Sequence, residues 1–187
     1  MNYNTREEWL TALVEKLAPL FVAQNYELPA IRVSCSWPSR LPRKRIGECW
    51  QARASKDGSS QIFISPTLDD GVRVADVMVH ELLHAVLPDD VRHKGPFRQG
   101  MKALGLEGKP TATTAGPELK ERLNIICSDL GKYPHAALSL DLQMKKQTTR
   151  LVKLECPGCG YIIRTTRTWI DDAGVPTCPC GSKFQEE

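Results

Sequence analysis

Apolar residues near the start of the chain recur with the spacing of an amphipathic helix. Thr5 and Glu8 form the sequence of a capping box, in which both side chains accept hydrogen bonds from amides at the helix start. We therefore expect a helix from Thr5 to about Gln24, with its apolar face packed on a core. The residues of that face are Trp9, Leu10, Leu13, Leu17, Leu20 and Phe21.

Three segments that follow have the patterns of strands. Apolar and polar residues alternate from Ile31 to Ser36, as in a half-buried strand. Residues 49–54 and 61–65 are two further strand candidates, and Asp57-Gly58 between them predicts a hairpin. The loop over residues 37–47 contains four basic residues; we interpret it as solvated, with nucleic-acid contact as the alternative.

The remaining pattern is helical up to about residue 130. Two aspartates at residues 69–70 are candidate N-caps for a helix over residues 72–86, which Pro88 ends. Further helices are expected over residues 96–104 and 117–130, each followed by a glycine. The order of one helix, three strands and then helices predicts an α+β fold class.

Composition narrows the class of protein. The 187 residues can form one core and a small accessory module. No apolar stretch is as long as a membrane span and the N-terminus lacks an export pattern. We therefore expect a cytoplasmic protein that is not secreted, or a nucleoid or nuclear one if it associates with DNA. Four of the seven cysteines cluster after residue 155, which indicates metal binding in a reducing compartment instead of disulfides. The formal net charge of +3 is too small to identify a nucleic-acid partner.

The sequence HELLH at residues 80–84 contains the candidate chemistry. Residues four apart share one face of a helix, so His80 and His84 can bind one ion, and zinc suits imidazole ligands. Glu81 lies about 100° further round the helix and is expected to act as general base. Because the neighbouring residues are apolar, the motif is expected to be buried, and buried polar groups need a reason. The alternative is an ordinary helix with histidines at its surface.

A catalytic zinc usually has three protein ligands, so the motif needs a further one. His93 follows His84 by nine residues, beyond the break at Pro88. Glu118 and Glu121 on the predicted later helix are competing candidates. Asp89, Asp90 and His135 complete the set of alternatives.

The last part of the chain has the pattern of a zinc ribbon. Two knuckles, Cys156-Pro-Gly-Cys159 and Cys178-Pro-Cys180, supply four thiolates for a tetrahedral structural zinc. The β-forming residues 161–170 and the turn residues 171–174 between the knuckles predict a small hairpin. The second knuckle is one residue shorter than usual, and a redox pair at Cys156 and Cys159 is the alternative.

A basic strip accompanies this cysteine-rich segment. It is opposed by Glu155 alone, and the aromatic side chains of Tyr161 and Trp169 are available for base stacking. Phosphate contacts and stacking are how proteins hold single-stranded DNA, so single-stranded or distorted DNA is a candidate partner. The alternative is a solvated ribbon that docks on the rest of the protein. The basic residues are Lys145, Lys146, Arg150, Lys153, Arg164 and Arg167.

One known family has a similar run of residues. HELLH followed by His93, Phe97, Met101 and Leu104-Gly105 resembles the SprT-like family, which includes the Spartan proteases. The family places a glycine directly after its third histidine ligand, whereas this chain has Lys94 there. The similar residues lie between His80 and Gly105, and the element order is similar over residues 6–130.

The resemblance implies a zincin-like minimal metalloprotease domain over residues 1–144 and a zinc ribbon with a basic connector over residues 145–187. It further implies that His93 is the third ligand and that the substrate is polypeptide bound or crosslinked to DNA. A second hypothesis is a non-catalytic zinc-ribbon module that binds DNA or acts in transcription. A third is a zinc amidase or peptidase acting on another substrate, such as a cell-wall peptide.

Overall fold

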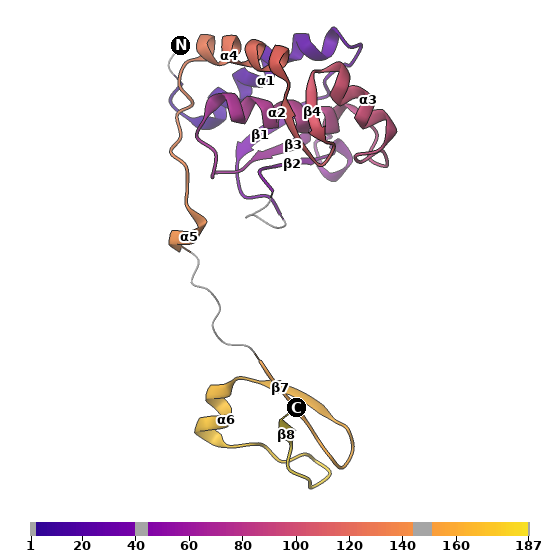
Figure 1. Ribbon diagram of the computed structural model, residues 1–187, viewed down its shortest axis with the longest axis vertical. Coiled ribbons are helices and arrows are strands. Elements are labelled where there is room, and N and C mark those ends of the chain that lie inside the picture. The colour runs from indigo at the N-terminus through magenta and orange to yellow at the C-terminus, as the bar shows by residue number, and fades with distance from the viewer. Residues whose placement is uncertain (1–2, 40–44, 144–150, 187) are drawn as a thin grey trace. The chain divides into compact units, whose positions relative to one another are not determined.

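The chain divides into two compact units, which are described separately below. The computed structural model describes residues 3–39, 45–143 and 151–186. The units are Met1–Leu140 and Asp141–Glu187, whose elements are labelled in Figure 1. Each unit has its own cluster of buried residues. The predicted boundary lay after residue 144, and the structure divides the chain after Leu140. The elements are a mixture of helices and small sheets, as the α+β prediction requires.

Helix α1 (Arg6–Val22) begins at the predicted capping box. The Glu8 amide donates to Thr5 Oγ1 and the Thr5 amide donates to Glu8 Oε2, both over 3.2 Å. The predicted apolar face is buried except for Leu20, which is half-buried. Asn25 has a φ of 60°, and the Tyr26 amide donates to the carbonyl of Phe21, so a Schellman motif closes the helix.

A three-stranded sheet follows, with the order β1-β3-β2. Strand β1 (Ile31–Cys35) runs parallel to β3 (Ser60–Ile64), and β2 (Gly47–Trp50) runs antiparallel to β3. The strand predicted over residues 49–54 was wrong at its end, because Ala52–Ala54 forms a 3₁₀ helix. The chain leaves the sheet at Gln51, whose side chain instead binds the end of the next helix.

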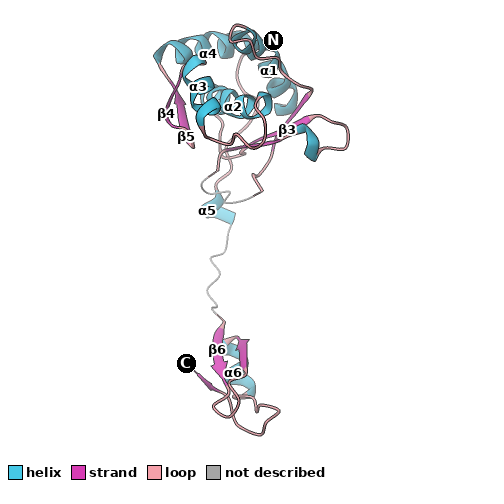
Figure 2. Ribbon diagram, turned by 90° about the vertical axis from the view of Figure 1, so that its right-hand side faces the viewer, coloured by secondary structure: helices cyan, strands magenta, loops and turns pink. Residues whose placement is uncertain are grey.

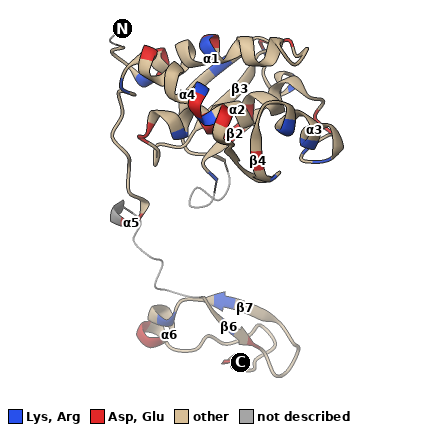
Figure 3. Ribbon diagram, turned by 45° about the horizontal axis from the view of Figure 1, so that its top comes forward, with Lys and Arg blue, Asp and Glu red and all other residues tan. Residues whose placement is uncertain are grey.

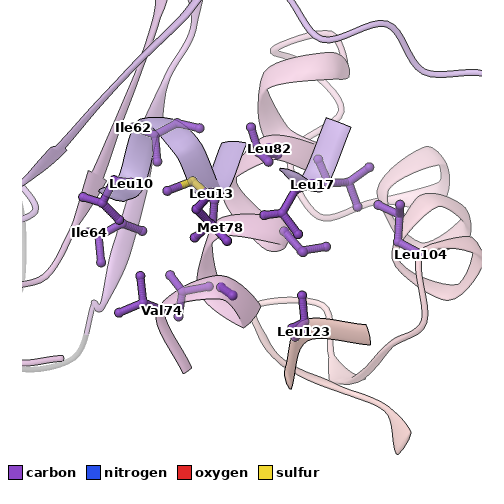
Figure 4. Close-up of a cluster of buried hydrophobic side chains, with 14 of the residues drawn as sticks. Leu10, Leu13, Leu17, Ile62, Ile64, Val74, Met78, Leu82, Leu104 and Leu123 are labelled. Atoms are coloured by element: carbon purple, nitrogen blue, oxygen red, sulfur yellow. The ribbon is translucent and has the colours of Figure 1, made fainter. Parts of the chain in front are cut away.

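Helix α2 (Gly71–Val86) was predicted to within one residue. The Asp70 side chain caps it by accepting from the Arg73 amide over 2.7 Å. It packs against β2, β3 and α4, and Figure 2 shows helices gathered on one face of the sheet. Apolar side chains from α1, β3 and α2 meet in the core (Figure 4). They include Leu10, Leu13, Leu17, Ile62, Ile64, Val74, Met78 and Leu82.

Two predicted helices are present, α3 (Gly95–Ala103) and α4 (Pro117–Leu130). Between them lies a hairpin that the sequence analysis did not predict, formed by β4 (Leu106–Lys109) and β5 (Ala112–Ala115). Its strands have four residues each and much of the hairpin is exposed, so the alternation is too short to recognise. No helix in the described part of the chain has the length and apolarity needed to cross a membrane.

The second unit contains a three-stranded sheet with the order β7-β6-β8. Its strands are β6 (Val152–Glu155), β7 (Ile162–Thr165) and β8 (Gln185–Glu186), and α5 (Leu140–Gln143) lies at the unit boundary. The strand and turn predicted over residues 166–174 were wrong, because Arg167–Ala173 forms helix α6. The Thr166 side chain caps this helix by accepting from the Trp169 amide, a local bond that competes with strand pairing.

Candidate metal centres

His80 and His84 on α2 and His93 in the loop that follows bring their ring nitrogens together. One nitrogen from each histidine lies within 4.8 Å of the others, and the Nε2 atoms of His84 and His93 are 3.1 Å apart. Two nitrogen ligands on a tetrahedral zinc lie ~3.3 Å apart, because each zinc–nitrogen distance is ~2.0–2.1 Å. The spacing and the donor set are therefore consistent with a zinc ion bound by these three histidines.

Side chains from the segment after β2 secure the chain around His84 and His93. Gln51 Nε2 donates to the carbonyl oxygen of His84 over 2.6 Å, at the end of α2 where helix carbonyls lack backbone partners. Arg53 forms an ion pair with Asp89, in the loop that joins the two histidines. These contacts hold the loop against the 3₁₀ helix, so that His93 returns to the face of α2.

Phe97 on α3 is the common neighbour of the three imidazoles. Its ring stacks on that of His84 with the centroids 4.4 Å apart and the planes at 27°. The rings of His80 and His93 meet it edge-on at 5.0 and 4.9 Å. Phe97 is fully buried, so it fills the space behind the histidines and restricts how they can rotate.

The electrostatic environment keeps the histidines neutral. Burial lowers the pKa of His80 to about 4 and that of His84 to about 3. Burial and then the positive charge of Arg45 also lower the pKa of His93. Because only a neutral imidazole nitrogen can bind a metal ion, all three are in the ligating form at neutral pH.

Glu81 is buried beside strand β2. Burial raises the pKa of its carboxyl to about 8, although Arg45 and a hydrogen bond from the Cys49 backbone amide oppose that rise. A Cβ atom at Gly47 would lie 2.5 Å from Glu81 Oε1, so a glycine at this position makes room for the carboxylate. Glu81 does not belong to the group that could hold a metal ion, which leaves it available as a base.

The other candidate ligands lie apart from the histidine cluster. Glu118 and Glu121 are exposed on α4, and neither joins the metal-binding group. His135 bonds instead to Arg6 and to the carbonyl of Pro66. Among the described residues, His93 is therefore the candidate that meets His80 and His84.

The four cysteines of the second unit also converge, within 4.8 Å of one another. Cys156 Sγ lies 3.3 Å from Cys180 Sγ, and Cys159 Sγ lies 3.6 Å from Cys178 Sγ. Two thiolates on a tetrahedral zinc lie ~3.8 Å apart, because each zinc–sulfur distance is ~2.3 Å. The four-thiolate set and its spacing are therefore consistent with a bound zinc ion.

The short second knuckle forms the same kind of turn as the first. The Gly160 amide donates to the carbonyl of Cys156, and the Gly181 amide donates to that of Cys178, both over 2.8 Å. Both glycines have positive φ, 71° and 92°, a conformation that glycine adopts without strain. The missing residue in the second knuckle therefore does not prevent its two thiols from facing the first pair.

The predicted DNA contacts fall partly in the connector and partly in the ribbon. Lys145, Lys146 and Arg150 lie outside the described residues. Lys153 pairs with Glu155, and Arg167 pairs with Glu186. Residues 151–186 contain four basic and four acidic residues, and Figure 3 shows both signs on this unit. The charges of residues 151–186 therefore cancel, and the excess of basic residues in this part of the chain lies in the connector.

The remaining predicted contacts in the ribbon are Arg164, Tyr161 and Trp169. Arg164 on β7 lies opposite Lys153 on β6. The side chains of Tyr161 and Trp169 are 54% and 65% exposed. These aromatic surfaces are open to a partner.

Sequence reasoning missed Gly47, Gln51 and Thr113, which lie against the motif on α2. Each lies at least 29 residues from the nearest histidine of the HELLH motif, and no sequence pattern links them to that motif.

Comparison with protein-family models, curated proteins and solved structures found no match. The similarity to SprT-like proteins therefore remains a resemblance of the motif residues.

Proposed function

We propose that the chain is a zinc-dependent metallopeptidase with Glu81 as general base. The observation that supports this most directly is the convergence of the ring nitrogens of three half-buried histidines, His80, His84 and His93. The buried Glu81 directly follows His80 on the same helix. Among the described residues, Glu81 has no ion-pair partner that would explain its burial. Burying an unpaired carboxylate is costly, so a role in chemistry accounts for it.

Each group has a definable task in peptide hydrolysis. A zinc ion at the three nitrogens would polarise the scissile carbonyl and make the attacking water more acidic. Glu81 would accept the proton of that water and pass it to the leaving amine. The Cys49 amide orients the carboxylate, and a nearby divalent cation would favour its ionised form over the neutral one.

Removal of the metal tests this proposal. We expect cleavage of an unfolded polypeptide such as casein to fall by at least ~10²-fold after chelation and to return when zinc is restored, because a metal-activated attack is lost. His84→Ala should bind one ion fewer per chain and should not regain activity. His135→Ala is the matched control, because His135 lies outside the cluster. Full cleavage by metal-free protein would contradict the proposal.

The finer part of the proposal is that the ribbon brings the peptidase to protein bound or crosslinked to DNA. It is supported by the exposed rings of Tyr161 and Trp169, by the neighbouring Lys153 and Arg164, and by the resemblance. A non-catalytic DNA-binding module remains the alternative function. Salt-sensitive DNA binding without zinc-dependent proteolysis would favour that alternative.

DNA binding is testable at Trp169. We expect Trp169→Ala to weaken binding of the full chain to a single-stranded oligonucleotide by about 5- to 150-fold, because one stacked base contributes ~1–3 kcal/mol. Fluorescence anisotropy at several salt concentrations measures the change. Trp37→Ala is the matched control, since Trp37 is an exposed tryptophan of the first unit. Equal affinity of Trp169→Ala and the wild type would rule out stacking on this ring.

A further inference from the structure

The unpredicted β4–β5 hairpin touches the metal-binding face of α2. Thr113 on β5 is 7% exposed, and its Oγ1 atom lies 2.8 Å from Nδ1 of His80. Thr113 is thus a buried polar residue whose described hydrogen-bond partner is a candidate metal ligand. The side chain of the next residue, Thr114, lies on the opposite face of the strand and is exposed.

The hydroxyl can select which nitrogen of His80 faces the metal. A neutral imidazole has one N–H and one bare nitrogen, and the hydrogen bond made by one nitrogen determines the state of the other. When Nδ1–H donates to Thr113 Oγ1, the lone pair is left on Nε2. Partners of this kind also fix the orientation of the ring and so prepare it to bind the ion.

The hairpin is attached firmly enough to act in this way. Its base is closed by the Gly116 amide, which donates to the carbonyl of Gly105 over 2.8 Å. Strand β5 also packs against helix α2. Thr113 therefore has a defined position relative to His80.

We propose that Thr113 is a positioning residue for the histidine metal site. The Thr113 hydroxyl holds Nδ1 of His80, so that Nε2 of His80 is presented to the ion. Its effect on metal affinity is independent of peptidase activity, and only its effect on catalysis rests on the proposed function. The hairpin thereby becomes part of the metal site, although it contributes no ligand.

Replacement of the hydroxyl by a methyl group tests the proposal. We expect Thr113→Val to lower the affinity of the histidine site for zinc about 10- to 100-fold, as loss of such partners typically does. Thr113→Ser keeps the hydroxyl and should bind zinc as the wild type does. Zinc affinity is measured by competition with a chelating dye on the full-length chain. Equal affinity of Thr113→Val and wild type would overturn the proposal, as would equal weakening by Thr113→Ser.

Two further measurements separate positioning from folding. Cobalt in the histidine site should show a changed visible spectrum in Thr113→Val and an unchanged one in Thr114→Val, the matched control on the exposed face. In the wild-type chain with ¹⁵N-labelled histidine, metal-free His80 should have its proton on Nδ1. A proton on Nε2 would overturn the proposal without any variant.

The outcomes also distinguish this inference from the proposed function. If the wild type binds zinc at the histidines but cleaves no polypeptide, the peptidase proposal fails and the Thr113 test still stands. If the wild type is an active zinc peptidase and Thr113→Val binds zinc normally, only the inference about Thr113 fails.

Discussion

Glu81→Gln should retain zinc at the histidine site and lose at least ~10²-fold in kcat for polypeptide cleavage, the smallest typical contribution of a general base. Glutamine has the size of glutamate but cannot accept the proton of the attacking water. Because burial disfavours the Glu81 carboxylate, the neutral amide should not weaken the fold. Metal content, thermal unfolding and turnover of casein, including cleavage of the chain by itself, are the three measurements.

Glu118→Gln is the matched control for Glu81→Gln. Glu118 is an exposed glutamate on α4 outside the metal-binding group, so its replacement should leave turnover and metal content unchanged. Undiminished proteolysis by Glu81→Gln would contradict the assignment of the base. Loss of zinc from that variant would instead indicate that Glu81 helps to hold the ion.

Loss of the ribbon metal should unfold the second unit and leave the first intact. The buried cluster of this unit consists of Leu154, Phe184 and two of the candidate ligands, Cys156 and Cys178. So small a core cannot offset the conformational entropy of ordering the unit, whereas structural zinc contributes ~10–16 kcal/mol. We therefore expect Cys156→Ser to lose hydrogen-exchange protection throughout residues 151–186, while the amides of α1 and α2 stay protected.

Cys127→Ser is the matched control for the ribbon prediction. Cys127 is a half-buried thiol on α4 of the first unit and lies outside the cysteine cluster. It should keep the protection of both units and the full metal content. Normal protection of residues 151–186 in Cys156→Ser would contradict a structural role for the metal.

The features that could be predicted from the sequence are those that depend on short-range interactions. Helix α1 begins at its capping box, and α2 begins at Asp70, because caps are made by side chains within three residues of the helix start. The pairing of His80 with His84, and of Cys156 with Cys159, follows from spacing along one helix or one turn. Such features need no knowledge of the rest of the fold.

Local chemistry also explains where the predictions failed. Residues 166–170 are rich in β-formers, yet the Thr166 cap and Gly174 at the end make 167–173 helical. Strand β2 ends before residue 51, because Gln51 binds α2 instead of continuing the sheet. In both cases one hydrogen-bonded side chain outweighed the average propensity of the segment.

The sequence by itself determined the helix with the motif, the candidate base and the two sets of candidate ligands. It left several choices for the third ligand of the histidine site. Only the tertiary structure brought His93 to His80 and His84, because a loop held by Arg53 and Asp89 returns it to α2. Only the tertiary structure brought Phe97, Gly47 and Thr113 around the same helix. Contacts between residues far apart in the chain depend on how elements pack, and packing leaves no periodic pattern in the sequence.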